Sequence, residues 1–317
     1  MPVKRLLTAV MLMGAPWPAG AQIDLNPPKP ASVITVDVDL VNLLCSVRDK
    51  RGAYVKDLAK EDFEIRQDGK RQPITHFARE VDSPMTVALL LDVSGSVAQI
   101  IGTEKAAAER FFDEVLRPGD QALLVGFAQV IAVWQELTPS KERLHSALER
   151  AGPGALPTGD PEIRPRGGTL LYDAVGLVAS QKLQRLPGRK TIVLITDGED
   201  NGSIANIAKA VQAAQEADAV VYGIHYENDE RGGSGRNGRS ALEKLSEPTG
   251  GRTFHVSAKL PLGEIFNQIG EEMRHQYGLG FTPPAEGKDG EFHKLEVKST
   301  KVGLKAQART GYYSGRK

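Results

Sequence analysis

Residues 85–97 read Met-Thr-Val-Ala-Leu-Leu-Leu-Asp-Val-Ser-Gly-Ser-Val. The first seven residues form an apolar run without alternation, which is typical of a strand covered on both faces in a parallel sheet. Ligands of such sheets bind beyond the carboxyl ends of the strands, and Asp92 stands at that end. Gly95 permits a tight turn, and Ser96 is suited to cap the helix that follows. The pattern Asp-x-Ser-x-Ser therefore predicts a site around Asp92, Ser94 and Ser96.

Two later segments carry further oxygen ligands to the same kind of position. Thr169 follows two glycines at the start of a predicted helix, and Asp197 ends the apolar strand 191–195. Taken singly, each motif could have a purely structural role, in which its Asp, Ser or Thr ends a strand or caps a helix. Three motifs in chain order, all at strand ends or helix starts, favour a cation site over that explanation.

The three motifs together resemble the complete metal-ion-dependent adhesion site of von Willebrand factor type A (VWA) domains. The resemblance implies an α/β fold of Rossmann-like type, with a central mostly parallel sheet and helices on both faces. It also implies that the cation is Mg²⁺ or Mn²⁺, with Ca²⁺ as an alternative. The metal ligands that it implies are Asp92, Ser94, Ser96, Thr169 and Asp197.

The ligand types agree with a hard divalent cation. Carboxylates, hydroxyls and water suit Mg²⁺, and two carboxylates balance its charge while neutral hydroxyls leave it electron-poor. An open coordination position then favours an acidic group from outside. The resemblance implies that this group is an Asp or Glu carboxylate of a protein partner. We therefore expect a cation-dependent protein-binding module, not an enzyme. The alternative is a hydrolase in which the metal activates water, although Glu199 and Asp200 are the nearest acids in the sequence and have no recognisable placement as a base.

The N-terminus has the features of a secretory signal peptide, predicted over residues 1–21. Lys4 and Arg5 precede a ten-residue apolar stretch, and Ala19-Gly20-Ala21 is a small-residue cleavage site. Ten apolar residues are too few to cross a bilayer, which takes roughly 20. We expect a secreted, periplasmic or cell-envelope protein without stable membrane insertion after cleavage. The alternative is an uncleaved anchor, because Pro16-Trp17-Pro18 flanks the cleavage site and could slow its processing.

Charge and cysteine content limit the possible binding partners and covalent cross-links of the protein. The 317 residues include 40 basic and 40 acidic side chains, so no broad basic face for nucleic acid is expected. Cys45 is the only cysteine, which excludes an intrachain disulfide. It follows Leu43-Leu44 as a lipid-attachment site would, but its place inside a strand pattern favours a buried thiol.

Both ends of the mature chain show antiparallel β patterns. A Pro-rich linker is predicted over 22–32, followed by strands within 33–82, and strand patterns return within 277–314. Asp68-Gly69 predicts a hairpin between strands 63–66 and 74–77. Neither segment has enough strands to bury a core alone. We therefore expect one small antiparallel β-sandwich built from both segments, with the α/β domain inserted over 84–276.

The flanking segments carry a narrower resemblance. They are similar to the secreted bacterial VWFA-related proteins of the acidobacterial type in Asp62-Phe63, Asp68-Gly69-Lys70 and the ending Gly311-Tyr312-Tyr313. This resemblance covers nearly the whole mature chain, but its motifs are less specific than the metal site.

Two glycine-rich segments are predicted to be loops. The Pro/Gly-rich loop 152–168 is predicted to overhang the metal and form its rim. Gly233-x-Gly235-x-x-Gly238 matches a dinucleotide-binding fingerprint by letter, but it follows a late strand and a charged spacer. We interpret it as a surface loop.

Overall fold

The computed structural model of the protein describes residues 40–79, 83–94, 101–152, 168–226, 235–284 and 289–315. These residues belong to one compact unit, Asp39–Lys317. The predicted signal peptide and linker lie outside the described residues, as do Ser96 and most of the loop 152–168. In the described part of the chain, no helix has the length and apolarity needed to cross a membrane.

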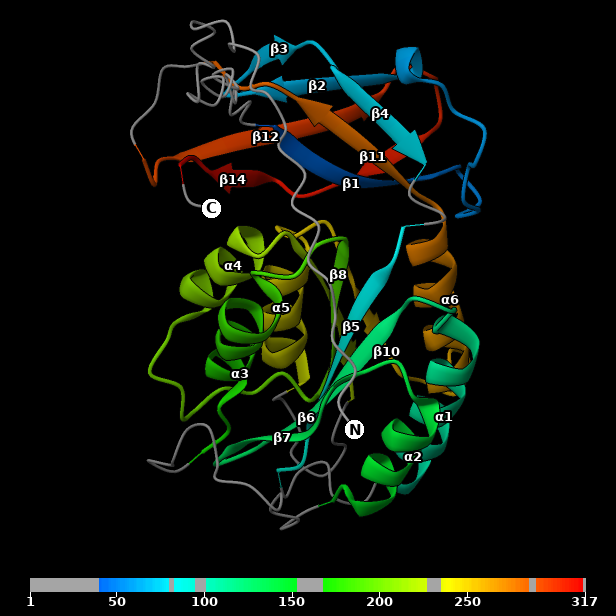
Figure 1. The fold of residues 1–317 in the computed structure, drawn as a ribbon, viewed down its shortest axis with the longest axis vertical. Helices are drawn as coiled ribbons and strands as arrows, with labels where there is room; N and C mark the ends of the chain where they lie inside the picture. Colours follow the sequence, from blue (N-terminus) through cyan, green and yellow to red (C-terminus); the bar gives the residue numbers. More distant parts are fainter. Residues whose placement is uncertain are drawn as a thin grey trace, which may run out of the picture. The chain divides into compact units, whose positions relative to one another are not determined.

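A six-stranded sheet forms the centre of the fold (Figure 1). Its order is β10-β9-β8-β5-β6-β7, and only β7 runs antiparallel to its neighbour. Every residue of the central strands β5 and β8 is buried, as the unbroken apolar run predicts. The strands are β5 (Met85–Asp92), β6 (Gln121–Phe127), β7 (Ile131–Thr138), β8 (Arg189–Thr196), β9 (Ala219–His225) and β10 (Thr253–His255).

Helices cover both faces of this sheet (Figure 1). Because neighbouring residues of a strand point to opposite faces, Leu89 belongs to one core and Leu90 to the other. One face carries α1 (Ile101–Val115), α2 (Lys141–Arg150) and α6 (Leu262–Arg274). The other carries α3 (Leu171–Leu177) with its π-helical extension Val178–Leu183, α4 (Ile207–Glu216) and α5 (Gly235–Ser246). The predicted α/β fold with helices on both faces is confirmed.

Two four-stranded antiparallel sheets are built from both ends of the described chain. One has the order β13-β1-β11-β4, with β1 (Val41–Arg48), β4 (His76–Arg79), β11 (Gln276–Phe281) and β13 (Lys305–Gln307). The other has the order β14-β12-β2-β3, with β2 (Phe63–Gln67), β3 (Lys70–Gln72), β12 (Phe292–Ser299) and β14 (Gly311–Tyr313). A separate core joins the two sheets, where the rings of Phe63 and Tyr277 lie 5.1 Å apart. The expected antiparallel strands from both ends of the chain are confirmed, whereas the domain bounds 33–82, 84–276 and 277–314 stay predictions.

The hairpin at Asp68-Gly69 forms, but its second strand was predicted wrongly. β2 pairs with Lys70–Gln72, whereas the predicted partner 74–77 includes the start of β4, which pairs with β11 in the other sheet. The physical reason is Pro73, which has no N–H for a sheet ladder and ends β3 after three residues. The chain then crosses to the opposite sheet, where Phe77 stacks against Tyr277 with ring centroids 6.0 Å apart.

A buried carboxylate connects the composite sandwich to the α/β domain. Glu272 of α6 has no exposed side-chain surface, and its Oε1 accepts a 2.9 Å hydrogen bond from Ser46 of β1. Its Oε2 accepts from the Tyr54 hydroxyl at 2.8 Å and from Arg252 Nε at 2.9 Å. Because Glu272 is both paired and fully hydrogen-bonded, its burial is tolerated. The network ties β1 to the last helix of the α/β domain.

Candidate metal centre

The central sheet brings the predicted ligands to one edge. β5 and β8 are parallel neighbours in which Leu91 faces Ile195, so Asp92 and Thr196 end their strands side by side. Thr169 immediately precedes Leu170, whose N–H donates to the carbonyl of Ala128 just beyond β6. Four of the five predicted ligands, all but Ser96, lie among the described residues.

Asp92 is the buried carboxylate of this edge, with 0% of its surface exposed. Its Oδ2 accepts a 2.6 Å hydrogen bond from the hydroxyl of Thr196, and its Oδ1 accepts from the N–H of Ser94 at 2.9 Å. Burial raises the pKa of the Asp92 carboxyl to about 6, and the negative charge of Asp197 adds to the rise. The edge thus holds two neighbouring carboxylates, one of them desolvated, an arrangement that a bound cation stabilises.

Asp197 lies in a tight turn after β8 and is partly exposed. Its Oδ1 accepts a hydrogen bond from the N–H of Glu199 at 3.0 Å, and the N–H of Gly198 donates to Thr196 Oγ1 at 3.0 Å. Gly198 has φ +79°, a left-handed conformation that favours glycine. Thr196 therefore links the two acidic strand ends, because its hydroxyl accepts from Gly198 and donates to Asp92.

Thr169 is held against the segment that follows Asp197. Its backbone carbonyl accepts from the N–H groups of Asn201 and Gly202, and its own N–H donates to Asn201 Oδ1 at 2.6 Å. Gly168, with φ +89°, leaves the space that the Asn201 side chain occupies. These contacts fix Thr169, which is 8% exposed, beside the turn that carries Asp197.

Two further acidic residues near this edge organise the backbone. Asp200 Oδ2 accepts from the N–H of Tyr172 at 3.0 Å and from the hydroxyl of Ser203 at 2.5 Å. Asp173 accepts from the N–H groups of Ile204 and Ala205 at 2.8 and 2.9 Å. Asp200 thus joins α3 to the loop after β8, a role that its position in the sequence does not reveal.

Gly238 is a residue of this edge that the sequence analysis misplaced in a surface loop. The helix α5 begins at Gly235, and Gly238 is buried against the turn after β8. A Cβ added to Gly238 would lie 1.9 Å from the carbonyl oxygen of Asp197, so only glycine fits there. The signal was present in the Gly-x-Gly-x-x-Gly pattern, whose last glycine permits close packing of a helix on a strand end; Gly233 lies outside the described residues.

The donor set fits a hard cation. Among the described residues, no group of three or more His, Cys, Asp and Glu side chains is placed to hold a metal. The five predicted ligands are two carboxylates and three hydroxyls. Carboxylate and hydroxyl oxygens are the donors that Mg²⁺ prefers, whereas a thiolate or imidazole site would suit softer ions.

Comparison with known proteins gives the family. The sequence profile of the von Willebrand factor type A domain matches residues 86–268, more than half of the 317 residues. The chain belongs to the VWA family. The VWA domain spans β5 to α6 and contains both acidic strand ends described above. Domains of this family are mostly interaction or adhesion modules that commonly act through a divalent cation.

Solved structures of VWA proteins are similar to this chain at low sequence identity. BatB from Bacteroides thetaiotaomicron is 20% identical, with 60% of this chain and 97% of that chain covered and a TM-score of 0.48. A von Willebrand factor type A protein from Catenulispora acidiphila is 14% identical, covering 82% and 76%, with a TM-score of 0.48. Proximal thread matrix protein 1 from the mussel byssus, solved with a zinc-occupied MIDAS motif, is 16% identical, covering 67% and 50%, with a TM-score of 0.49. Among curated proteins, no sequence matches the chain.

Proposed function

We propose that the protein is a secreted or cell-envelope binding module whose divalent cation bridges to an acidic side chain of a protein partner. The observation that carries this proposal is the pair of neighbouring carboxylates at one strand edge, with Asp92 fully buried and Asp197 partly exposed. The residues proposed to hold the ion are Asp92, Ser94, Ser96, Thr169 and Asp197.

The ligand types determine what the ion does in this proposal. When bound, Mg²⁺ or Mn²⁺ supplies a positively charged coordination position for an outside carboxylate. The buried Asp92 places negative charge on the protein side of the ion. The neutral hydroxyl ligands do not neutralise the remaining positive charge, which faces the partner. The role assigned to the ion is bridging between proteins, with no catalytic step.

In this proposal, Ile204 in the segment after β8 supplies a second contact to the partner. The backbone N–H of Ile204 donates to Asp173 Oδ2 at 2.8 Å, yet the Ile204 side chain is 77% exposed. A large aliphatic side chain on a firmly held backbone loses little conformational freedom when a partner covers it. The partner that fits best presents an Asp or Glu next to an apolar residue.

The export pathway in this proposal rests on the N-terminal sequence. Residues 1–21 carry the basic start, the apolar stretch and the small-residue cleavage site of a signal peptide. Mass determination of the N-terminus of the protein recovered from its native compartment tests this part, with cleavage after Ala21 as the expected result.

The binding proposal is tested by capturing envelope and secreted proteins on the immobilised chain in Mg²⁺, in chelator and with the Ser96→Ala variant. The matched control is Ser180→Ala, on the π-helical extension. This substitution removes an exposed hydroxyl that donates to the backbone carbonyl of Gly176 in α3. We expect capture by the wild type and Ser180→Ala in Mg²⁺ only, and no capture by Ser96→Ala. Neutralising one acidic residue of the captured partner should also abolish binding. A partner retained in chelator and by Ser96→Ala would refute metal-bridged recognition.

A further inference from the structure

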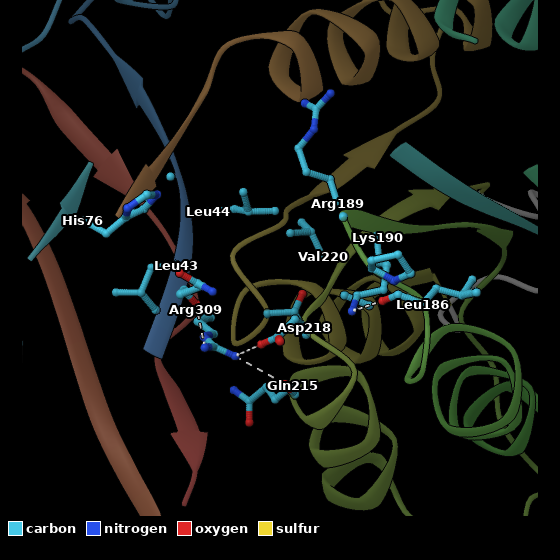
Figure 2. Close-up of a pocket in the computed structure, with 16 residues that line it drawn as sticks. Leu43, Leu44, His76, Leu186, Arg189, Lys190, Gln215, Asp218, Val220 and Arg309 are labelled. Atoms are coloured by element: carbon cyan, nitrogen blue, oxygen red, sulfur yellow. Dashed lines mark hydrogen bonds and ion pairs between the residues drawn. The ribbon is translucent and has the colours of Figure 1, made fainter. Parts of the chain in front are cut away.

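A cavity of about 400 Å³ lies between the β1–β11–β4 sheet and the start of β8 and β9 (Figure 2). Its walls come from β1, β4 and β11 on one side and from residues 186–190, Gln215, residues 218–220 and Thr249 on the other. Cavities of roughly 300 to 1,000 Å³ hold small-molecule ligands. This one is separated from the candidate metal centre by the length of β8, roughly 20 Å at about 3.3 Å per residue.

A buried lysine contributes to the lining of this cavity. Lys190 is 6% exposed, and its Nζ donates a 3.0 Å hydrogen bond to the backbone carbonyl of Leu186. An ammonium group has three N–H donors. Among the residues that the structure describes, no carboxylate forms an ion pair with Lys190, and its pKa is lowered by burial. Within the described part of the chain, the ammonium therefore has spare donors and no carboxylate in direct contact.

Asp218, the carboxylate close to Lys190, already forms an ion pair with Arg309. Asp218 Oδ1 accepts from Arg309 Nη1 at 2.5 Å, and Arg309 Nη2 donates to the carbonyl of Asn42 at 2.7 Å (Figure 2). Lys190 and Arg309 therefore share the charge of one carboxylate, which leaves a local excess of one positive charge. Arg189 also lines the cavity, but its guanidinium points away and donates to the carbonyls of Ser83 and Met273 (Figure 2).

Apolar surface adjoins these charged groups. Leu44 of β1 and Val220 of β9 point toward each other across the cavity, and Leu186 lies beside Lys190 (Figure 2). We propose that the cavity binds an aliphatic carboxylate, with its carboxylate at the Lys190 ammonium and its hydrocarbon chain between Leu44 and Val220. A single excess positive charge matches a monoanion better than a phosphate dianion. The aliphatic walls match the hydrocarbon chain.

Calorimetric titration of the full-length chain with octanoate, octanol and octylamine tests this proposal. We expect octanoate to bind on the order of tenfold more tightly than octanol, because a charge-assisted hydrogen bond adds to the same apolar contact. Octylamine should bind more weakly than octanol. Octanoate affinity should be equal in Mg²⁺ and in chelator, since the cavity and the metal centre lie at opposite ends of the strands.

Two variants test whether the carboxylate of octanoate binds at Lys190. Lys190→Met should reduce octanoate affinity to that of octanol, and Leu186→Glu should do the same by placing a carboxylate beside the ammonium. The matched control is Lys141→Met, because Lys141 Nζ also donates to a backbone carbonyl, that of Asp113, but lies outside the cavity. Equal affinity for octanoate and octanol, no measurable octanoate binding, or unchanged binding by Lys190→Met would each overturn the proposal.

Discussion

The hydroxyl of Thr196, at the end of β8, donates a 2.6 Å hydrogen bond to Oδ2 of Asp92, at the end of β5. The bond joins two strand ends that are 104 residues apart in the chain. It holds one oxygen of the buried carboxylate in place, while the N–H of Ser94 holds the other at 2.9 Å. Two hydrogen bonds therefore position the Asp92 carboxylate, and a cation bound beside Asp197 would supply its counter-charge.

Magnesium should stabilise the protein after chelator treatment. At a free concentration about 100-fold above the dissociation constant, the gain is roughly 2.7 kcal/mol. For a domain of about 200 residues this raises the melting temperature by on the order of 5 to 10 °C. Asp92→Asn should remove the shift, whereas Asp113→Asn, on the exposed side of α1, should keep it. A melting curve unaffected by saturating Mg²⁺ would argue against the assigned ligands.

The close approach of Gly238 to the Asp197 carbonyl predicts a second loss of metal response. Gly238→Ala places a methyl group where that carbonyl lies, so the turn carrying Asp197 has to move. We expect a lower melting temperature and a smaller Mg²⁺ shift in thermal denaturation. Gly176→Ala is the control, because a Cβ there meets no atom within 4 Å. It should leave the Mg²⁺ shift intact and stabilise helix α3 by roughly 0.5 to 1 kcal/mol.

The buried Glu272 predicts an unequal response to two charge removals. Arg252→Met removes the paired cation and leaves a fully buried carboxylate with neutral donors only, which should lower the free energy of unfolding by roughly 3 to 5 kcal/mol. Glu271→Gln, at a half-exposed neighbour on α6, should change it by less than about 0.5 kcal/mol. Urea denaturation measures both. Equal small effects would show that the Arg252–Glu272 pair does not stabilise the junction.

Cys45 should report on opening of the composite sandwich. Its thiol is fully buried, and burial raises its pKa to about 12. The native protein should therefore resist thiol-directed reagents at pH 8 to 9, where an unfolded thiol of pKa about 8.5 reacts readily. Because the folded-state pKa is the higher one, the stability linked to this thiol is present below the unfolded pKa and is lost as pH rises toward 12.

That linkage is measured by comparing the pH dependence of unfolding for the wild type and Cys45→Ala. The difference between the two should change only at alkaline pH. Rapid labelling of Cys45 under native conditions at pH 8 would instead show that β1 separates readily from β11.

The sequence by itself determined the α/β class, the apolar central strands and the residues most suited to hold a cation. Unbroken runs such as 85–91 and 191–195 leave few alternatives to buried parallel strands, because no polar face remains for water. Asp92 and Asp197 then have to lie at the carboxyl edge of the sheet, since Asp92 directly follows its run and Asp197 follows its run after Thr196. The metal itself, and the ligand roles of Asp92, Ser94, Ser96, Thr169 and Asp197, remain predictions.

Only the tertiary structure decided which residues support that edge and where the terminal strands pair. The contact of Gly238 with Asp197, the bonds of Asp200 to α3 and the crossing of β4 to the other sheet all join segments distant in the chain. Local patterns record a residue's preference for a conformation and for burial, but not its partner. Glu272 shows the same limit, because its hydrogen bonds from Ser46 and Tyr54 form only where the composite sandwich meets the α/β domain.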